Sequence, residues 1–318
     1  MGTPQPHDTL FHFTFHQVRH AAGWVRSVLP AALAAAIDWT SLRAAPEKVH
    51  GRALRFAVTD ILLLAELAAS GHTIAFVPEH KSGPAPELQA QLLGYCVHVG
   101  ETMGPTNGPP PLVIPILLSH AEEPWPGTPP SHPHLAELDP GAAKALAAVQ
   151  PRLTFFIDDL TRCTEQHLRR PGLTALAQLT LLCLRFLPDA SSSEALAAFD
   201  RWQDLLRAVD ADEGPPSGPA AVAAIGEYAL VTTGVEPVNL HTAFQRILQR
   251  SEETIMTTVQ NLIQRSRAET LLRQMAKRFG APSDETIRRV RAATPAELDI
   301  WLDRILDAES VAELFAEA

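Results

Sequence analysis

Thr73-Ile74-Ala75-Phe76-Val77-Pro78-Glu79-His80-Lys81 is the stretch that decides the fold, an apolar run that ends in a charged triplet. Alternate side chains of a strand share a face, so we expect Glu79 and Lys81 to project together while His80 points away. A carboxylate and an ammonium would then lie side by side. The triplet alone fits either a catalytic pair or an ordinary salt pair where a strand meets solvent.

A second β-like run, Leu54 to Leu67, precedes the first one, and Ser70-Gly71 between them supplies turn chemistry, which predicts an antiparallel hairpin. This pairing can bring Asp60 opposite Glu79. Two carboxylates suit Mg²⁺, which usually takes one or two of them and leaves the other positions to water and substrate phosphate. Lys81 would orient a water or neutralise charge at the scissile phosphate. The spacing favours a metal-dependent phosphodiesterase centre.

The rest of the chain predicts an α/β core, a small mixed sheet flanked by helices, followed by an all-α C-terminal region. A Pro/Gly-rich segment, Asp210 to Pro219, is expected to hold a domain boundary. We predict a nuclease-like domain over residues 1–190, a helix and linker over 191–219 and a helical domain over 220–318. The expected elements are helices over Leu10 to Ile37 (restarted by Pro30), Glu87 to Gly100, Ala142 to Val149 and from Leu173 onward, and strands over Leu112 to Leu118 (with Pro115 at an edge or bulge) and Leu153 to Ile157.

Composition limits the classes of protein that the chain can represent. A formal charge of −10 argues against a protein that coats nucleic acid electrostatically, although a nuclease needs only a local basic surface. Three cysteines without C-x-x-C spacing indicate core residues instead of a zinc site or disulfide framework. No apolar run predicts a membrane span or signal peptide, so we expect a cytoplasmic protein with no membrane partner. Without a glycine-rich phosphate loop or G-x-S-x-G motif, covalent catalysis is unsupported.

Three further groups of residues allow either a functional or an ordinary structural interpretation. Asp8 is either an additional acidic ligand or a helix N-cap, and the cap is favoured. Gln89 and Gln91 follow the triplet on the next helix, where either could contact a metal-bound water or DNA, or simply face solvent. His12, His16 and His20 share i, i+4 spacing, which would place them along one helical face, as a metal site or as solvent-facing residues.

Several separated blocks resemble the Rpn (recombination-promoting nuclease) or YhgA-like putative transposase family, which belongs to the PD-(D/E)XK nuclease superfamily. Arg278-Phe279-Gly280 and Trp301-Leu302-Asp303-Arg304 are similar to a DUF4351-like helical domain that often follows such nucleases. The N-terminal blocks that carry the resemblance are His7-Asp8-Thr9-Leu10-Phe11, Asp60-Ile61-Leu62-Leu63, Glu79-His80-Lys81-Ser82 and Leu92-Leu93-Gly94-Tyr95.

The resemblance implies a restriction-endonuclease-like fold and Mg²⁺-dependent hydrolysis of DNA phosphodiesters, with Mn²⁺ as an alternative metal and a link to recombination or a mobile element. It gives Asp60 and Glu79 the metal-ligand role and Lys81 the superfamily's lysine role. Thr59 replaces the superfamily's proline, and Ala57, Val58 and Gly94 stand where relatives carry arginines. These losses motivate an alternative from another class, a catalytically weak DNA-binding or assembly protein that self-associates through its C-terminal helices.

Overall fold

The computed structural model forms two compact units, residues 1–188 and 189–318. The structure describes residues 5–45, 61–83, 85, 87–107, 109–121, 123–125, 137–151, 153–249, 264, 268, 271–272, 274–280, 282–305, 308 and 310–315. The predicted domain boundaries at residues 190 and 219 stay predictions.

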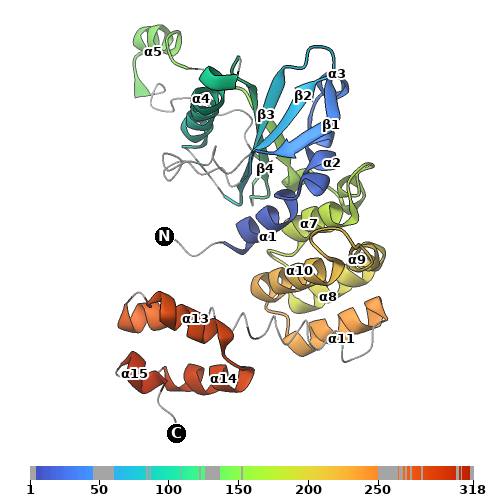
Figure 1. Cartoon of the computed structure of the whole chain (residues 1–318), viewed down its shortest axis with the longest axis vertical. Coiled ribbons are helices and arrows are strands. Elements are labelled where there is room, and N and C mark those ends of the chain that lie inside the picture. The colour runs from blue at the N-terminus through green and yellow to red at the C-terminus, as the bar shows by residue number, and fades with distance from the viewer. Residues whose placement is uncertain are drawn as a thin grey trace. The chain divides into compact units, whose positions relative to one another are not determined.

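The described part of the first unit is built on a five-stranded mixed sheet of order β1-β2-β3-β4-β5 (Figure 1). The β1–β2 and β2–β3 pairs are antiparallel, whereas β3–β4 and β4–β5 are parallel. The predicted mixed α/β core with a helical C-terminal region is therefore confirmed. The strands are β1 (Ile37–Ala44), β2 (Leu63–Leu67), β3 (Thr73–Lys81), β4 (Leu112–Ser119) and β5 (Phe156–Asp159).

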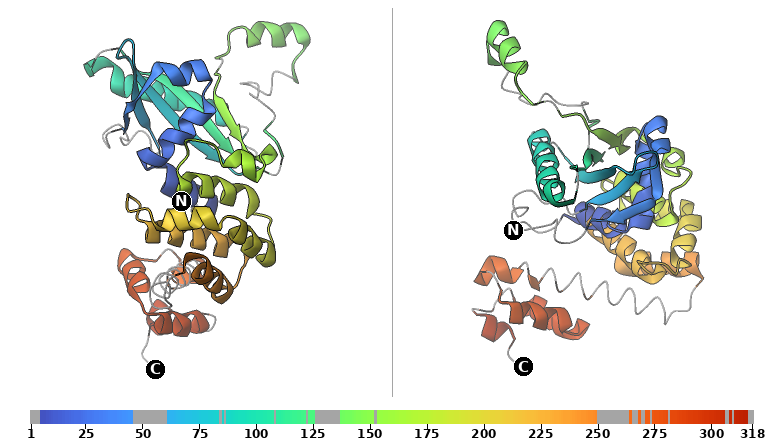
Figure 2. Two further views of the ribbon diagram at one scale, coloured as in Figure 1. Left: turned by 90° about the vertical axis from the view of Figure 1, so that its right-hand side faces the viewer. Right: turned by 45° about the horizontal axis from the view of Figure 1, so that its top comes forward.

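Helices cover both faces of the sheet because the side chains of β3 alternate between two apolar layers. Ala75 and Val77 pack with Leu88, Leu92 and Tyr95 of α4 (Leu88–Asn107). On the other face lie α1 (Pro6–Phe15), α2 (Val18–Val28) and α3 (Ala31–Ala36), with α7 (Ala175–Phe186) packed behind α1 and α2 (Figures 1 and 2). The remaining elements of this unit are α5 (Pro140–Ala147), η4 (Leu160–Arg162) and α6 (Glu165–Leu168).

Pro115 lies in a central strand, at a position where the described ladder pairs it on one side. It pairs with Val77 of β3, but the β4–β5 register begins one residue later, at Ile116. Since proline has no N–H to donate, this position avoids a lost ladder hydrogen bond to β5. The edge position predicted for Pro115 therefore holds locally, within a strand that is central to the sheet.

Two predictions about the N-terminal helical segment need correction. The predicted restart at Pro30 is confirmed, because α2 ends at Val28 and α3 begins at Ala31. The first correction is an additional break at His16 and Gln17, which separates α1 from α2. The helical prediction ended at Ile37, where strand β1 begins, and this strand was missed. Most residues of β1 are half-buried or exposed, so its sequence lacks the apolar alternation by which strands are recognised.

Buried hydroxyls and one close backbone contact fix α7 and the turn before it against α1 and α2. Thr14 and Thr180 join α1 to α7 through an Oγ1–Oγ1 hydrogen bond of 2.8 Å. Gly23 of α2 lies so close to Gly172 that a Cβ on Gly23 would overlap the Gly172 carbonyl oxygen. The absence of a side chain at residue 23 thus sets how closely α2 and this turn approach.

The second unit is helical, as predicted, and its described helices form two groups. In the first group α9 packs against α8, α10 and α11, and Arg207 Nε donates to the Ile247 carbonyl oxygen at 2.7 Å. In the second group Leu271, Met275, Val290, Leu298 and Trp301 share a core. The helices are α8 (Ser192–Arg201), α9 (Gln203–Asp210), α10 (Gly218–Thr233), α11 (Pro237–Leu248), α13 (Asp284–Ala292), α14 (Pro295–Arg304) and α15 (Val311–Leu314).

Replacing Gly23 by alanine is expected to destabilise the first unit by about 2 kcal/mol, because overpacking outweighs the gain in helix propensity. Urea unfolding followed by tryptophan fluorescence measures the change through the unfolding midpoint. Gly94→Ala is the matched control, since Gly94 also lies within a helix but a Cβ there meets no atom within 4 Å. It should stabilise by roughly 0.5–1 kcal/mol. Equal shifts for the two variants would contradict the close contact of α2 with Gly172.

Candidate active site

Glu79 and Lys81 form an ion pair at the end of β3, with Lys81 Nζ 2.8 Å from Glu79 Oε1. Both side chains project toward α4, as the strand alternation predicts. Only 10% of the Glu79 side chain and 25% of the Lys81 side chain are exposed. The pair is therefore largely buried, unlike the solvent-facing salt pair that was the alternative interpretation of the triplet.

Gln91 of α4 lies against this pair. Its Nε2 donates to Glu79 Oε1 at 3.3 Å and also to the hydroxyl of the buried Tyr95. Gln89 lies two residues earlier and is itself buried. The solvent-facing interpretation is therefore wrong for Gln89, whereas Gln91 is half-buried and its amide bonds Glu79.

Asp60, the predicted partner carboxylate, lies outside the described residues. Among the residues that the structure describes, no group of three His, Cys, Asp or Glu side chains is arranged to hold a metal ion. The cysteines at positions 96, 163 and 183 are free thiols; Cys183 is buried, as predicted for a core residue, whereas Cys96 and Cys163 are half-buried. Glu79 is thus the one predicted metal ligand whose surroundings can be described.

His80 projects to the opposite face of β3, where α1 and the end of β4 enclose it. Its Nδ1 is 2.6 Å from Asp8 Oδ1, and its ring stacks on Phe11 and on His120, with centroids 5.1 and 4.9 Å away. The ring of His7 packs edge-on against the ring of His120, with the two centroids 4.7 Å apart. Because the carboxylate accepts the hydrogen bond, Asp8 places the proton on Nδ1 of His80.

Asp8 is not the N-cap that the sequence favoured. The N-cap of α1 is Gln5, and Asp8 stands in the first helical turn with its carboxylate directed at His80. Its pKa is lowered first by the hydrogen bond from His80 and further by the charges of His80, Lys81 and His7. The influence of Lys81 indicates that Asp8 lies near the strand end, and its role as an accessory ligand stays a prediction.

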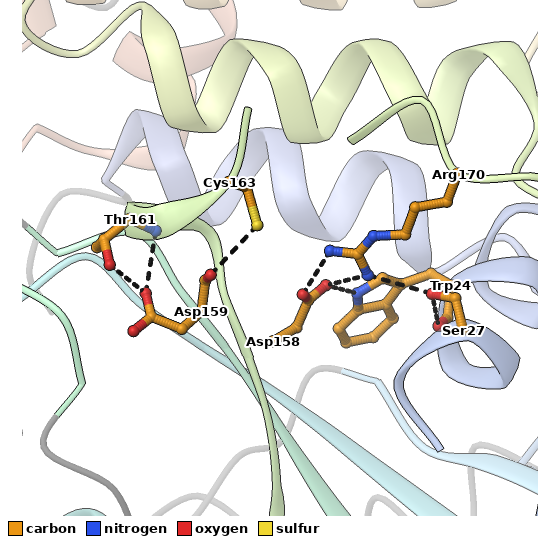
Figure 3. A network of polar contacts seen from close by, with 7 residues as sticks. All are labelled: Trp24, Ser27, Asp158, Asp159, Thr161, Cys163 and Arg170. Carbon is orange, nitrogen blue, oxygen red and sulfur yellow. Dashed lines mark hydrogen bonds and ion pairs between the residues drawn. The ribbon is translucent and has the colours of Figure 1, made fainter. Parts of the chain in front are cut away.

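A second polar network, which the sequence did not suggest, anchors the segment after β5 to α2 (Figure 3). Arg170 forms a two-pronged interaction with Asp158, Nη2 to Oδ1 at 2.6 Å and Nη1 to Oδ2 at 3.0 Å. Trp24 Nε1 donates to the same carboxylate at 2.8 Å. Burial by itself would lower the pKa of Arg170, but the hydrogen bonds and charge of Asp158 outweigh it and raise that pKa.

Residues 5–213 match the protein family described as "Putative transposase, YhgA-like". The chain belongs to this family. Comparisons with curated proteins and with solved structures found no match. The family match ends before the C-terminal helices, so their resemblance to a DUF4351-like domain stays a prediction. None of the helices in the described part of the chain is long and apolar enough to span a membrane.

Two of the blocks that carry the resemblance to the YhgA-like family, His7 to Phe11 and Glu79 to Ser82, meet on the α1 side of the sheet. In His7-Asp8-Thr9-Leu10-Phe11, residues 7, 8 and 11 all contact the rings of His80 or His120. The i, i+1, i+4 spacing of these residues places them on one side of α1. This spacing could have signalled a shared partner, but the partner itself, 72 residues beyond Asp8 in the chain, is a tertiary feature.

The predicted row of three histidines on one helical face is wrong. α1 ends at Phe15, and His20 belongs to α2. His12 and His16 still stack on each other, whereas His20 is fully buried and bonds Thr174 through Nδ1 at 2.6 Å. The helix break therefore removes the row as a metal site and also the solvent-facing interpretation of His20.

Acid is expected to destabilise the first unit through His120. Burial and the charges of His80 and His7 lower the pKa of His120 from 6.5 to about 3, and the charge of Asp8 opposes this shift only in part. As the pH falls from 6.5 toward 3, the unfolded chain binds a proton that the folded chain does not. The free energy of unfolding should then fall by on the order of a few kcal/mol. The lowered pKa of Asp8 adds a loss of stability at still lower pH.

Urea unfolding at a series of pH values, for the parent chain and for His120→Gln, measures this effect. The variant should lose most of the pH slope between 6.5 and 4, whatever its absolute stability. His72→Gln, in the exposed turn of the hairpin, is the control and should keep the slope. An unchanged slope in His120→Gln would contradict the assignment.

Proposed function

We propose that this YhgA-like protein is a metal-dependent DNA endonuclease that hydrolyses phosphodiester bonds at the Glu79–Lys81 end of β3. The largely buried ion pair of these residues carries the proposal. Burying two charges costs desolvation free energy, and a buried pair is often less stabilising than apolar residues of the same size. A pair of this kind at the end of a strand is therefore better explained by chemistry than by stability.

The donor atoms at this position fit a hard divalent cation. Glu79 offers a carboxylate, and no described thiol or imidazole is arranged beside it to form the three- or four-ligand set that zinc takes. Mg²⁺ needs only one or two protein carboxylates, as does Mn²⁺ in similar oxygen-rich sites. Glu79 and Asp60 are the residues that would hold the ion. When bound, such an ion supplies Lewis-acid stabilisation of charge on the phosphate and lowers the pKa of water.

The register of the hairpin supports Asp60 as the second carboxylate. The strands are antiparallel, with Leu63 paired with Phe76 and Leu64 with Ala75. Each step back along β2 therefore corresponds to one step forward along β3. Counting three residues back from Leu63 and three forward from Phe76 reaches Asp60 and Glu79. Asp60 itself lies outside the described residues, and this count is part of the proposal.

The other described side chains would position the reacting groups and hold Glu79 in place. Lys81 places a compact positive charge next to Glu79, where it would position the attacking water or neutralise charge on the scissile phosphate. Gln91 holds Glu79 by its amide and is in turn held by Tyr95, so α4 fixes the orientation of the carboxylate. Gln89 is a buried residue of the first turn of α4, and its part in the site stays a prediction.

The family description, which names a transposase, supports DNA as the substrate. A role in recombination or in a mobile element, in the cytoplasm and with self-association through the C-terminal helices, belongs to the same proposal. The alternative of a catalytically weak DNA-binding protein is motivated by the net charge of −10 and by the absence of arginine at positions 57, 58 and 94. Salt-dependent DNA binding without a metal-dependent product would favour that alternative.

Glu79→Gln and Lys81→Ala should each lower the rate of plasmid nicking in Mg²⁺ by at least about a hundredfold, because each removes a charge that acts on the reacting phosphate. Lys144→Ala is the matched control, since Lys144 is an exposed lysine of α5. It should keep the parent rate. Equal nicking by all four proteins would end the site assignment, and circular dichroism checks that each variant is folded.

Removal of divalent cations with EDTA should abolish nicking, and adding back Mg²⁺ or Mn²⁺ should restore it, because these ions suit carboxylate ligands. Glu79→Gln should require a higher concentration of Mg²⁺ for any residual nicking than the parent chain does. Nicking that persists at full rate in EDTA would contradict a metal-dependent reaction.

A further inference from the structure

Ser119 is the last residue of β4 and lies directly beside Lys81. The parallel register pairs Ser119 with Lys81 of β3 on one side and with Asp159 of β5 on the other. Leu117, two residues earlier on β4, belongs to the core that the sheet forms with Leu88 of α4. Because alternate side chains of a strand share a face, Ser119 also projects to the α4 face, the face of the Glu79–Lys81 ion pair.

The hydroxyl of Ser119 is buried and lacks a hydrogen bond. The residue is fully buried, and in the part of the chain that the structure describes its Oγ has no hydrogen-bond partner. Buried polar groups almost always have such a partner, because an unpaired one loses the hydrogen bond that it would make to water. Alanine at this position would avoid that loss. The stability of the fold therefore gives no reason for a serine here.

The neighbour of Ser119 on β5 is held by other groups. Asp159 Oδ1 accepts hydrogen bonds from the N–H and the hydroxyl of Thr161, at 3.0 and 2.6 Å, as Figure 3 shows. Its Oδ2 accepts from the N–H of Trp125 at 2.9 Å. The carboxylate of Asp159 thus fixes the two segments that follow β4 and β5 and does not bond the serine. The polar side chain on the other flank of Ser119 is that of Lys81.

The ammonium of Lys81 has hydrogen-bonding capacity beyond its ion pair. An ammonium carries three N–H donors, whereas the acceptor that the described residues provide is one atom, Glu79 Oε1, at 2.8 Å. Gln91 Nε2 donates to the same oxygen at 3.3 Å. A divalent cation held by Glu79 would repel the ammonium strongly, because the two positive charges would share one carboxylate in a largely buried place. Lys81 then needs a second acceptor.

Ser119 can provide this acceptor without any movement of the backbone. Neighbouring strands lie about 4.8 Å apart, which is less than the length of an extended lysine side chain. A change of rotamer can therefore carry the ammonium from Glu79 toward Ser119 Oγ, on the same face of the sheet. A hydroxyl oxygen has two lone pairs and accepts an N–H readily.

We propose that Ser119 is a positioning residue, whose hydroxyl accepts a hydrogen bond from the Lys81 ammonium when Glu79 binds a divalent cation. The ammonium then stays beside the reacting phosphate instead of being driven into solvent. This inference rests on the proposed metal-dependent hydrolysis, and it adds a residue that no motif of the sequence indicated. The missing hydrogen bond of the hydroxyl is a loss of stability that is kept for activity, as at many functional sites.

Urea unfolding in EDTA, followed by tryptophan fluorescence, tests whether the hydroxyl has a structural role. Ser119→Ala should unfold at the same urea concentration as the parent chain or at a higher one, because it removes an unpaired buried group. Thr180→Val is the matched control: Thr180 is also fully buried, but its hydroxyl bonds Thr14 at 2.8 Å, so the midpoint should fall. A fall in Ser119→Ala as large as that in Thr180→Val would overturn the inference.

The same unfolding series in Mg²⁺ tests the link to Lys81 without measuring catalysis. Mg²⁺ should raise the midpoint of the parent chain, because a ligand that binds the folded state stabilises it, and should raise that of Ser119→Ala less. In a Lys81→Ala background the serine should no longer matter, so Lys81→Ala and the double variant should respond equally to Mg²⁺. Parent and Ser119→Ala responding equally would overturn the inference.

Plasmid nicking in Mg²⁺ supplies the functional readout. Ser119→Ala should lower kcat by about tenfold, as expected for the loss of one hydrogen bond to a charged group, and leave the KM for plasmid unchanged. Ser119→Thr, which keeps the hydroxyl and suits a strand, should restore most of the rate, whereas Ser119→Cys should not, because a thiol is a weak acceptor.

The outcomes separate this inference from the proposed function. A parent chain that neither nicks DNA nor gains stability from Mg²⁺ would overturn the proposed function, and this inference with it. A parent chain that nicks DNA at the same rate as Ser119→Ala would overturn the role of Ser119 alone and leave the assignment of Glu79 and Lys81 intact.

Discussion

The parallel pairing of β3 with β4 is the constraint on which the rest of the first unit depends. It runs without a break from Ile74–Leu112 to Lys81–Ser119, whereas the described β2–β3 register ends at Phe76. Beyond that point β4 keeps residues 77–81 extended, so their side chains alternate between the two faces. In an irregular loop the charged triplet would have no fixed direction, and neither the ion pair nor the histidine stack would form.

The alternation gives the two faces of the strand end different environments. On the α4 face, Glu79 forms an ion pair with Lys81 and accepts a hydrogen bond from Gln91, and both charged side chains are largely buried. On the α1 face, His80 is enclosed by aromatic rings and fixed by Asp8. Packing of His80 anchors the backbone between the two charged residues, which helps to hold their side chains in one arrangement. The buried histidine thus supports the candidate site without belonging to it.

The pair of Asp158 and Arg170 has a comparable role two strands away, since His80 and Asp158 both pair with Leu118 of β4. Its two hydrogen bonds, with that of Trp24, tie the end of β5 to α2 and to the turn before α7. Such a pair is weak evidence for stability, because the desolvation of two charges offsets their attraction. What it supplies here is position, because it fixes the turn beside Gly23.

The sequence by itself determined the hairpin, the directions of Glu79, His80 and Lys81, the α4 helix and the helical second unit, because strand and helix periods are local properties of the chain. It did not reveal β1, whose half-exposed residues lack an apolar pattern, or the break between α1 and α2 that separates His16 from His20. It also misjudged Asp8 and Gln91, since each finds its partner on a distant segment of the chain. Only the tertiary structure decided that Asp8 bonds His80, that Gln91 holds Glu79 and that Arg170 reaches Asp158, because packing between elements, and not local period, brings these side chains together.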